Sequence, residues 1–399
     1  MQGVFFEITM DYFYTTSTST IPNCIVEADK KLHNILVRHA HFYNYLLPKY
    51  SDDSYKRLID KGETPTFNYL PFSGSKANEL LEPINKLEFD DQHPMGIELE
   101  KLIKNIKLWV HAITERTPAA FYELNLNSGW YDFNFLLEES MLKDIREGKG
   151  FYNCSAPWPR EYDFFESQDK DRNASMSSTK LIAILKKELQ HRGFKFWKVR
   201  QSKHMASPVT VVNGKRLIIV KSNLEFKKEI ISRIIFHELD GHVHRRHNGL
   251  KQQLRCFDSG LARSSFTEEG LAMVTEEKAV GLDLSNMQNL FWLSKAISMA
   301  DDANFYEIFD FLRNRIGDYH AWSGALRLKR GLESSQKGCL ALDNAYLLGR
   351  HCVKDWLHDG GDIKHLYTGR VGIDNPVGDW LKEGWVSLQP VPDIWDVKQ

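Results

Sequence analysis

The sequence predicts an α+β protein that is mostly helical, with a small β-sheet beside one long helix and a helical lobe at the amino terminus. Three observations lead to this fold class. Apolar residues recur at helical spacing up to about residue 148, alternate over residues 194–220, and return to helical spacing from residue 222. The 399 residues, 42% of them hydrophobic, provide enough apolar surface for a large core and exclude a disordered chain.

Composition shifts along the chain predict its organisation. Residues 14–22 are rich in hydroxyl groups and end at Pro22, so we expect a flexible leader over residues 1–22. Helical periodicity follows, and residues 150–178 hold prolines with little periodicity. These shifts predict a helical lobe with a junction loop over residues 23–178 and a second lobe over residues 179–399.

Cysteine usage and hydropathy indicate where the protein works. The five cysteines are odd in number, widely spread and form no C-x-x-C pair, which argues against a disulfide framework. The first residues do not read as a signal peptide, and nowhere do eighteen apolar residues stand together. We therefore expect a cytoplasmic protein that does not bind membranes.

The sheet and the helix after it are predicted from short-range signals. A helix through Leu181–Leu189 stops at Gly193, and Phe194–Val199 then alternates as a strand does. Two further runs flank Asn213-Gly214, which predicts a β-hairpin. A helix is predicted from Ser222, with Glu225 completing a capping box. Later helices are predicted over Thr267–Val280, Asn289–Met299, Ala303–Ile316 and Ala345–His358.

The helix predicted from Ser222 carries a motif with metal chemistry. His237-Glu238-Leu239-Asp240-Gly241-His242 is an H-E-x-x-x-H pattern, in which two imidazoles can bind zinc and the adjacent carboxylate can take a proton from water. Five residues at about 100° each place the two histidines roughly 140° apart on a straight helix. The motif therefore predicts a π-bulge, with Gly241 tolerating the distorted backbone.

Residues near the motif leave alternatives open. His244 and His247 are predicted to form a solvated basic face with Arg245 and Arg246 rather than to bind metal. Glu268 and Glu269 form an acidic pair after Thr267, which is predicted to cap a helix. One of the pair could be a third metal ligand, or both could simply favour the positive end of the helix dipole.

Several motifs taken together resemble one known family. The run from Leu217 to Glu277 is similar to the microtubule-associated tyrosine carboxypeptidase family and its bacterial QEGLA-motif relatives. Pro65-x-Phe67-x-Tyr69 resembles the family's element in the amino-terminal lobe. Two carboxy-terminal motifs complete the resemblance, Arg327-Leu328-Lys329-Arg330-Gly331 and Tyr346-Leu347-Leu348-Gly349.

The resemblance implies a zincin-like metallopeptidase that removes a carboxy-terminal residue, tyrosine or another aromatic. By position it implies that residues 179–399 form the catalytic lobe and that Zn²⁺ is the cofactor. His237, His242 and Glu269 are the implied ligands, with Glu238 as the general base. Tyr131-Asp132 departs from the family's Tyr-Gly, which puts the shape of the cleft in question.

Substrate binding is predicted from general chemistry. An extended substrate could pair with Leu217–Val220, taken as an edge strand. A free α-carboxylate suits a guanidinium, so Arg327 and Arg330 are candidates together with Tyr346, and Lys329 is a weaker one. Residues 181–255 hold 17 Lys and Arg against 5 Asp and Glu, which favours an acidic peptide or protein tail as partner. No nucleic-acid motif is present.

Two other classes of protein fit part of the pattern. Two histidines and a carboxylate also form the facial triad of non-haem iron(II) oxygenases. Glu238 favours the hydrolase, because an oxygenase has no evident need of it. The third class is a binding module whose metal site is inactive.

Overall fold

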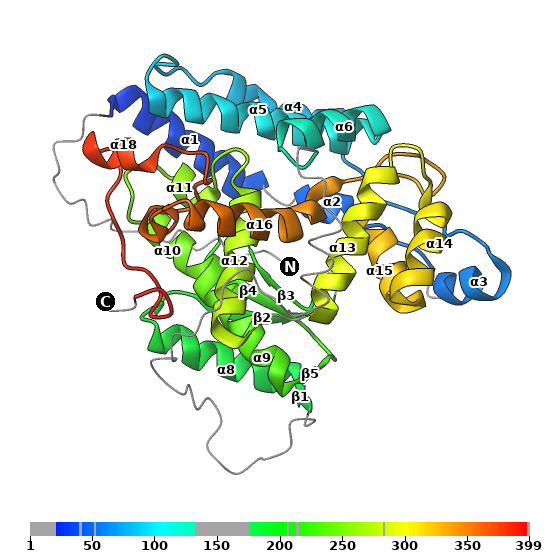
Figure 1. Cartoon of the computed structure of the whole chain (residues 1–399). Coiled ribbons are helices and arrows are strands. Elements are labelled where there is room, and N and C mark those ends of the chain that lie inside the picture. The colour runs from blue at the N-terminus through cyan, green and yellow to red at the C-terminus, as the bar shows by residue number, and fades with distance from the viewer. Residues whose placement is uncertain are drawn as a thin grey trace, which may run out of the picture.

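The computed structural model describes residues 21–39, 42–51, 53–131, 175–203, 205, 207–212, 215–281 and 284–396. The expected leader therefore lies almost entirely outside the described residues, as do most of the junction loop and Asp132. Over these residues the protein is mostly helical with two small sheets, which confirms the α+β class. Figure 1 shows α4 and α5 along one side and α8 with the strands at the opposite end, while α12 and α16 lie between them.

The helices before the sheets are α1 (Asn23–His39), α2 (Phe42–Leu46), α3 (Ser54–Lys61), α4 (Gly74–Asn85), α5 (Pro94–Glu115) and α6 (Pro118–Asn127). Those in the middle of the chain are α8 (Ser178–His191), α9 (Lys228–Ile234), α10 (His244–Gly249), α11 (Cys256–Ser259) and α12 (Ser265–Val280). The last are α13 (Leu284–Met299), α14 (Phe305–Ile316), α15 (Asp318–Leu328), α16 (Asn344–His358), α17 (Ile363–Leu366) and α18 (Val377–Lys382).

The amino-terminal helices share their cores with distant parts of the chain. Leu58 of α3 is buried in one apolar cluster with Phe305 of α14, and the ring of Tyr55 packs edge-on against Trp322 of α15. Ile25 of α1 is buried in a second cluster, which includes residues of α11, α17 and α18. The division into an amino-terminal lobe and a catalytic lobe stays a prediction.

The larger sheet has the strand order β2-β4-β3. Its strands are β2 (Lys198–Ser202), β3 (Val209–Val211) and β4 (Leu217–Lys221). β3 and β4 pair antiparallel, which confirms the hairpin, although its Asn213-Gly214 turn lies outside the described residues. β4 also pairs with β2 in parallel and is therefore the central strand. The prediction that Leu217–Val220 is an edge strand was wrong, because β2, which comes earlier in the chain, pairs along its second edge.

Two predicted boundaries near this sheet were also wrong. Phe194–Trp197 forms a turn, with the Trp197 amide donating to the Phe194 carbonyl at 3.1 Å, so β2 begins only at Lys198. The helix expected from Ser222 begins at Lys228, because β5 (Glu225–Lys227) pairs antiparallel with β1 (Ser175–Ser177). That pairing partner lies about fifty residues earlier, so the local capping pattern could not reveal it.

Helices α9 and α10 continue one another through a π-helical stretch, η1 (Ile235–Val243), which confirms the predicted bulge. A buried apolar stripe anchors this stretch against α8 and the larger sheet; its members are Ile231, Ile235, Leu239 and Val243. Among the helices of the described residues, none combines the length and apolar composition that a membrane crossing needs.

Candidate metal centre

The π-helical stretch brings the two histidines of the motif to the same side. The rings of His237 and His242 are tilted by 79° to one another, with centroids 5.0 Å apart. In a π-helix about five residues complete a turn, so residues five apart share a face, as they do not in an α-helix. The backbone irregularity thus serves to pair the two imidazoles.

Glu269 on α12 completes a cluster of three possible ligands. Its Oε2 atom lies 3.7 Å from Nε2 of His237 and 3.6 Å from Nε2 of His242. The three ligand atoms all lie within 4.8 Å of one another. Glu269 Oε2 is buried and accepts no hydrogen bond from the described residues. A buried carboxylate oxygen without a donor is costly, and a bound cation between these atoms would remove that cost.

A second carboxylate lies behind each histidine. Glu276 is 3.3 Å from Nδ1 of His237, and Glu268 is 3.0 Å from Nδ1 of His242. A carboxylate at Nδ1 fixes the proton there and leaves Nε2 with its lone pair, which is the form that binds metal. Both Nε2 atoms face Glu269. The orientation of the cluster is therefore determined by residues outside it.

Sequence reasoning missed the roles of Glu268 and Glu276. Glu276 could have been found, because it lies seven residues after Glu269 and two helical turns place both side chains on one face. Glu268 was considered only as a ligand or as a residue favoured by the helix dipole. In the structure its side chain is buried and contacts His242, so the dipole does not explain its position.

Two arginines neutralise Glu268. Arg245 donates to its Oε2, and Nε of Arg370 lies 3.2 Å from its Oε1. Burial by itself would raise the pKa of Glu268, but Arg370, Arg245 and His242 together hold it well below the usual range. Glu268 is therefore ionised although its side chain is buried.

The expected solvated basic face does not exist. Arg245 is 0% exposed and Arg246 is 4% exposed, and their guanidinium groups donate to carbonyl groups of Val371 and Val212 respectively. Burial lowers the pKa of His244 and of His247 to about 4 each. His244 and Arg245 contact the carboxy-terminal segment, whereas Arg246 donates to Val212 and the His247 ring packs against Phe194. The spacing of these residues could not indicate such contacts.

Close helix contacts set the distance between the ligands. A Cβ atom on Gly241 would lie 2.6 Å from Cβ of Ala272, so this glycine allows η1 and α12 to approach. We predicted Gly241 as a residue that tolerates the distorted backbone of the bulge. In the structure the lack of a side chain matters for the contact with Ala272. A Cβ on Gly270, next to Glu269, would lie 2.2 Å from the backbone of Gly349 in α16. Glycines therefore hold η1, α12 and α16 together around the cluster.

The predicted cap of α12 was wrong. The helix begins at Ser265, ahead of Thr267. The Thr267 hydroxyl is buried and accepts a hydrogen bond from the amide of Ile373 at 2.9 Å. The Thr267 hydroxyl therefore bonds to the carboxy-terminal segment and does not cap the helix.

Glu238, the expected general base, lies beside His237 and is half-buried. Burial raises the pKa of its carboxyl group, while His242 and His237 act in the opposite direction. A carboxylate with a raised pKa is suited to accept a proton near neutral pH.

The candidates for binding the substrate carboxylate have different surroundings. Lys329 is fully buried and donates to carbonyl groups of Ala303, Gln336 and Gly338, so its ammonium group has a structural role. Arg327 pairs with Asp343 and lies 5.5 Å from the ring of Tyr346. Arg330 is 6% exposed.

Two of the resembling motifs meet in the structure. The Tyr69 hydroxyl donates to the carbonyl groups of Lys329 and Leu332, at 3.0 and 2.6 Å. Phe67 is buried against the ring of Phe305. The Pro-x-Phe-x-Tyr element therefore anchors the segment that carries Arg327 and Arg330. Tyr131 donates to Asp301, so the described half of the departing Tyr-Asp pair is also structural.

Two imidazoles and a carboxylate, each imidazole backed by a second carboxylate, define a candidate metal centre on a mostly helical α+β fold. The family model described as microtubule-associated tyrosine carboxypeptidase matches residues 58–387, and the chain belongs to that family. This confirms the resemblance seen in the sequence. The family name implies a hydrolase of the carboxypeptidase type. No curated protein matches the chain.

Proposed function

We propose that this protein is a zinc-dependent carboxypeptidase that hydrolyses the last peptide bond of a free carboxy terminus and releases tyrosine or another aromatic residue. The observation that carries the proposal is the convergence of His237, His242 and Glu269, with ligand atoms within 4.8 Å of one another. Family membership supports the type of reaction.

The donor set fits zinc. Two neutral imidazoles and one carboxylate are a common set in hydrolytic zinc sites, which keep a fourth position open. Zinc held by these residues would polarise the scissile carbonyl and lower the pKa of bound water. Iron(II) would accept the same three ligands, so metal analysis and oxygen dependence distinguish the hydrolase from an oxygenase.

Glu238 performs the proton transfers in this proposal. Its carboxylate accepts a proton from the attacking water and returns it to the amine that leaves. Position also supports this role, because Glu238 directly follows His237 on η1 and has a raised pKa.

Arg327, Arg330 and Tyr346 remain our candidates for binding the substrate α-carboxylate. Tyr346 lies on α16, and that helix crosses α12 at Gly270, the residue after Glu269. The guanidinium of Arg327 lies over the Tyr346 ring. This arrangement supports a carboxylate subsite near the metal ligands.

The location of an extended substrate differs from the expectation drawn from sequence. β4 is central and has no free edge, whereas β3 is an outer strand and packs near η1. We propose that the substrate backbone pairs along β3. The excess of cationic residues over 181–255 favours an acidic tail, and the family name makes a tail of a microtubule protein in the cytoplasm the first candidate.

The direct test compares peptides with free and amidated carboxy termini. The zinc-loaded protein and its Glu238→Gln variant are incubated with a peptide library, and products are identified by mass spectrometry. We expect loss of one carboxy-terminal residue from free ends only, and none with the variant. Equal cleavage of amidated peptides would show an endopeptidase, and oxidised products that need oxygen would show an oxygenase.

A further inference from the structure

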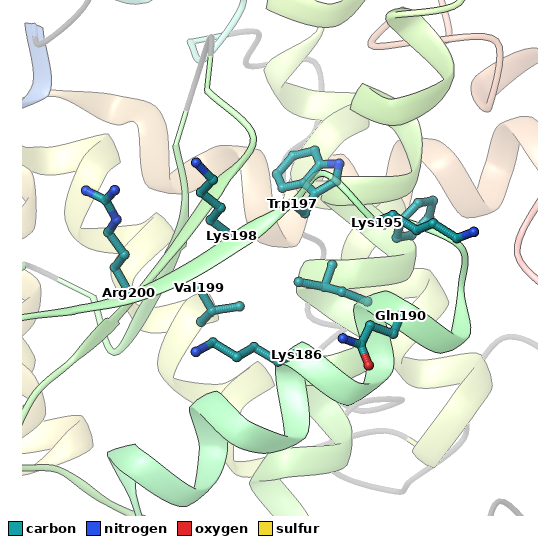
Figure 2. A pocket seen from close by; sticks show the side chains of 9 residues that line it. Lys186, Gln190, Lys195, Trp197, Lys198, Val199 and Arg200 are labelled. Carbon is teal, nitrogen blue, oxygen red and sulfur yellow. The ribbon is translucent and has the colours of Figure 1, made fainter. Parts of the chain in front are cut away.

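A groove lies between α8 and the outer edge of β2, away from the metal cluster and sharing no residue with it. Its volume is about 330 Å³. Figure 2 shows Lys186 and Gln190 extending from α8, with Lys198 and Arg200 on β2 and Lys195 in the turn before it. The buried side chains that line it are Leu189, Phe194, Trp197 and Val199.

Four of the residues that line this groove are exposed cations, and none is a carboxylate; the cations are Lys186, Lys195, Lys198 and Arg200. None of the four forms an ion pair with the residues that the structure describes. Elsewhere in the same region, Arg192 is fully engaged with Asp240 and Glu188. The groove therefore has positive charge available for an anionic partner.

The outer edge of β2 has backbone hydrogen-bonding groups that pair with no strand of the described residues. Lys198 donates its amide to the Arg216 carbonyl, and the Ser202 carbonyl accepts from the Ser222 amide, so these residues face β4. Polar groups alternate in direction along a strand, and Val199 and Gln201 must face the outer edge. In the described chain no strand pairs with that edge.

Cations from β2 and from α8 lie on opposite sides of the position that an added strand would take. In Figure 2 Val199 points towards α8, whereas Lys198 and Arg200 point to the other side of the strand. Lys186 reaches the groove from α8. A strand added here would present alternate residues to the two faces, so consecutive acidic residues would each meet a cation.

We propose that the outer edge of β2 binds an extended acidic peptide segment by strand addition, with a run of consecutive Asp or Glu residues as its recognition feature. Main-chain bonds to Val199 and Gln201 provide the pairing, and the four cations select for negative charge. This docking requires no hydrolysis and does not depend on the proposed peptidase activity.

Binding is tested with a fluorescein-labelled decapeptide of glutamates whose carboxy terminus is amidated, so that a carboxypeptidase site does not retain it. Fluorescence anisotropy is measured on the full-length protein at several salt concentrations, with a glutamine decapeptide as control. We expect saturable binding of the acidic peptide only, weakening as salt rises. Absence of binding would mean that the charged edge only prevents aggregation, and the proposal would be wrong.

Two pairs of substitutions locate the site. Lys186→Glu with Lys198→Glu should weaken binding by about tenfold or more, since each reversal replaces an attraction by a repulsion. Lys104→Glu with Lys107→Glu, at exposed positions on α5, makes the same change in net charge and should have little effect. If both pairs of substitutions weaken peptide binding equally, the binding reflects the net charge of the protein alone, and the assignment of the site to β2 is wrong.

A backbone variant tests strand addition itself. Gln201→Pro removes an amide that points away from β4, so the β2–β4 pairing can remain. We expect weaker peptide binding with an unchanged circular dichroism spectrum and melting temperature. If Gln201→Pro folds and binds like the parent while the groove reversals do not, the peptide is held by charge alone and strand addition is excluded. Should this variant unfold, Gln201→N-methylglutamine introduced by semisynthesis makes the same test.

Discussion

Glu268 lies directly behind His242, with its carboxylate 3.0 Å from Nδ1 of the imidazole. The same carboxylate pairs with Arg245, whose guanidinium also donates to the carbonyl groups of Leu366 and Val371. The orientation of one candidate metal ligand is thus connected to the carboxy-terminal segment through a buried ion pair. The other candidate ligand, His237, contacts Glu276, which is paired with Arg233 on α9.

Removing the charge of Glu276 tests the positioning of His237. Glu276→Gln should lower zinc affinity by about 10- to 100-fold, because an outer carboxylate raises the basicity of the histidine and fixes its tautomer. Affinity is measured by competition with a chromophoric chelator. Glu225→Gln, on the exposed side of β5, is the control and should bind zinc like the parent protein. Unchanged affinity in Glu276→Gln would show that the contact is only structural.

Glu268→Gln should lower the free energy of unfolding. It leaves Arg245 and Arg370 without their buried counter-charge, and breaking a buried pair in this way costs about 3–5 kcal/mol. Urea unfolding of the metal-free protein measures that loss. A variant as stable as the parent would contradict the importance we assign to this network.

Glu238→Gln separates proton transfer from metal binding. The amide cannot accept the proton, so turnover should fall by about a hundredfold or more while one zinc per chain is retained. Metal content by atomic emission and peptide hydrolysis are measured on the same sample. Loss of zinc together with activity would point to a ligand role and against a base.

Gly241→Ala tests the contact between η1 and α12. The new methyl group would overlap Ala272, which we expect to destabilise the protein by about 1–3 kcal/mol and to weaken zinc binding. Adding Ala272→Gly removes the overlap with the Ala272 methyl but leaves a contact of 2.8 Å with the Cα of residue 272, so it should recover only part of both losses. Gly74→Ala is the matched control, since a Cβ there meets nothing within 4 Å. Unchanged stability and zinc affinity in Gly241→Ala would mean that η1 and α12 can move apart without a cost in free energy.

The half-buried histidines after the π-helix, His244 and His247, predict a pH dependence of stability. His247 has a pKa of about 4 when folded, against 6.5 for the ordinary group, so the unfolded chain binds more protons between these values. The free energy of unfolding should therefore fall as pH decreases from 6.5 to 4, by up to roughly 1.4 kcal/mol per pH unit for this residue.

This slope is measured by urea unfolding in the presence of a chelator, so that release of metal does not contribute. His247→Gln should reduce it, and His358→Gln, at an exposed position, should leave it unchanged. The same slope in both variants would show that His247 is not responsible.

The sequence by itself determined the features that depend on neighbouring residues. The spacing of His237 and His242 required a π-bulge, the apolar stripe of that helix indicated its buried face, and the turn signal at Asn213-Gly214 predicted the pairing of β3 with β4. The combination of motifs identified the family. The resemblance implied Glu269 rather than Glu268 as the third ligand, and Glu269 is the glutamate that lies with the two histidines in the candidate cluster.

Only the tertiary structure decided what lies around these residues. It made β4 central by adding β2, replaced the start of a helix by β5, buried Arg245 under the carboxy-terminal segment and packed His247 against Phe194. It also placed Glu268 and Glu276 behind the two imidazoles. Periodicity reports which side of an element is apolar, whereas the partner of a buried charge is chosen by segments far away in the chain, and no local pattern records that choice.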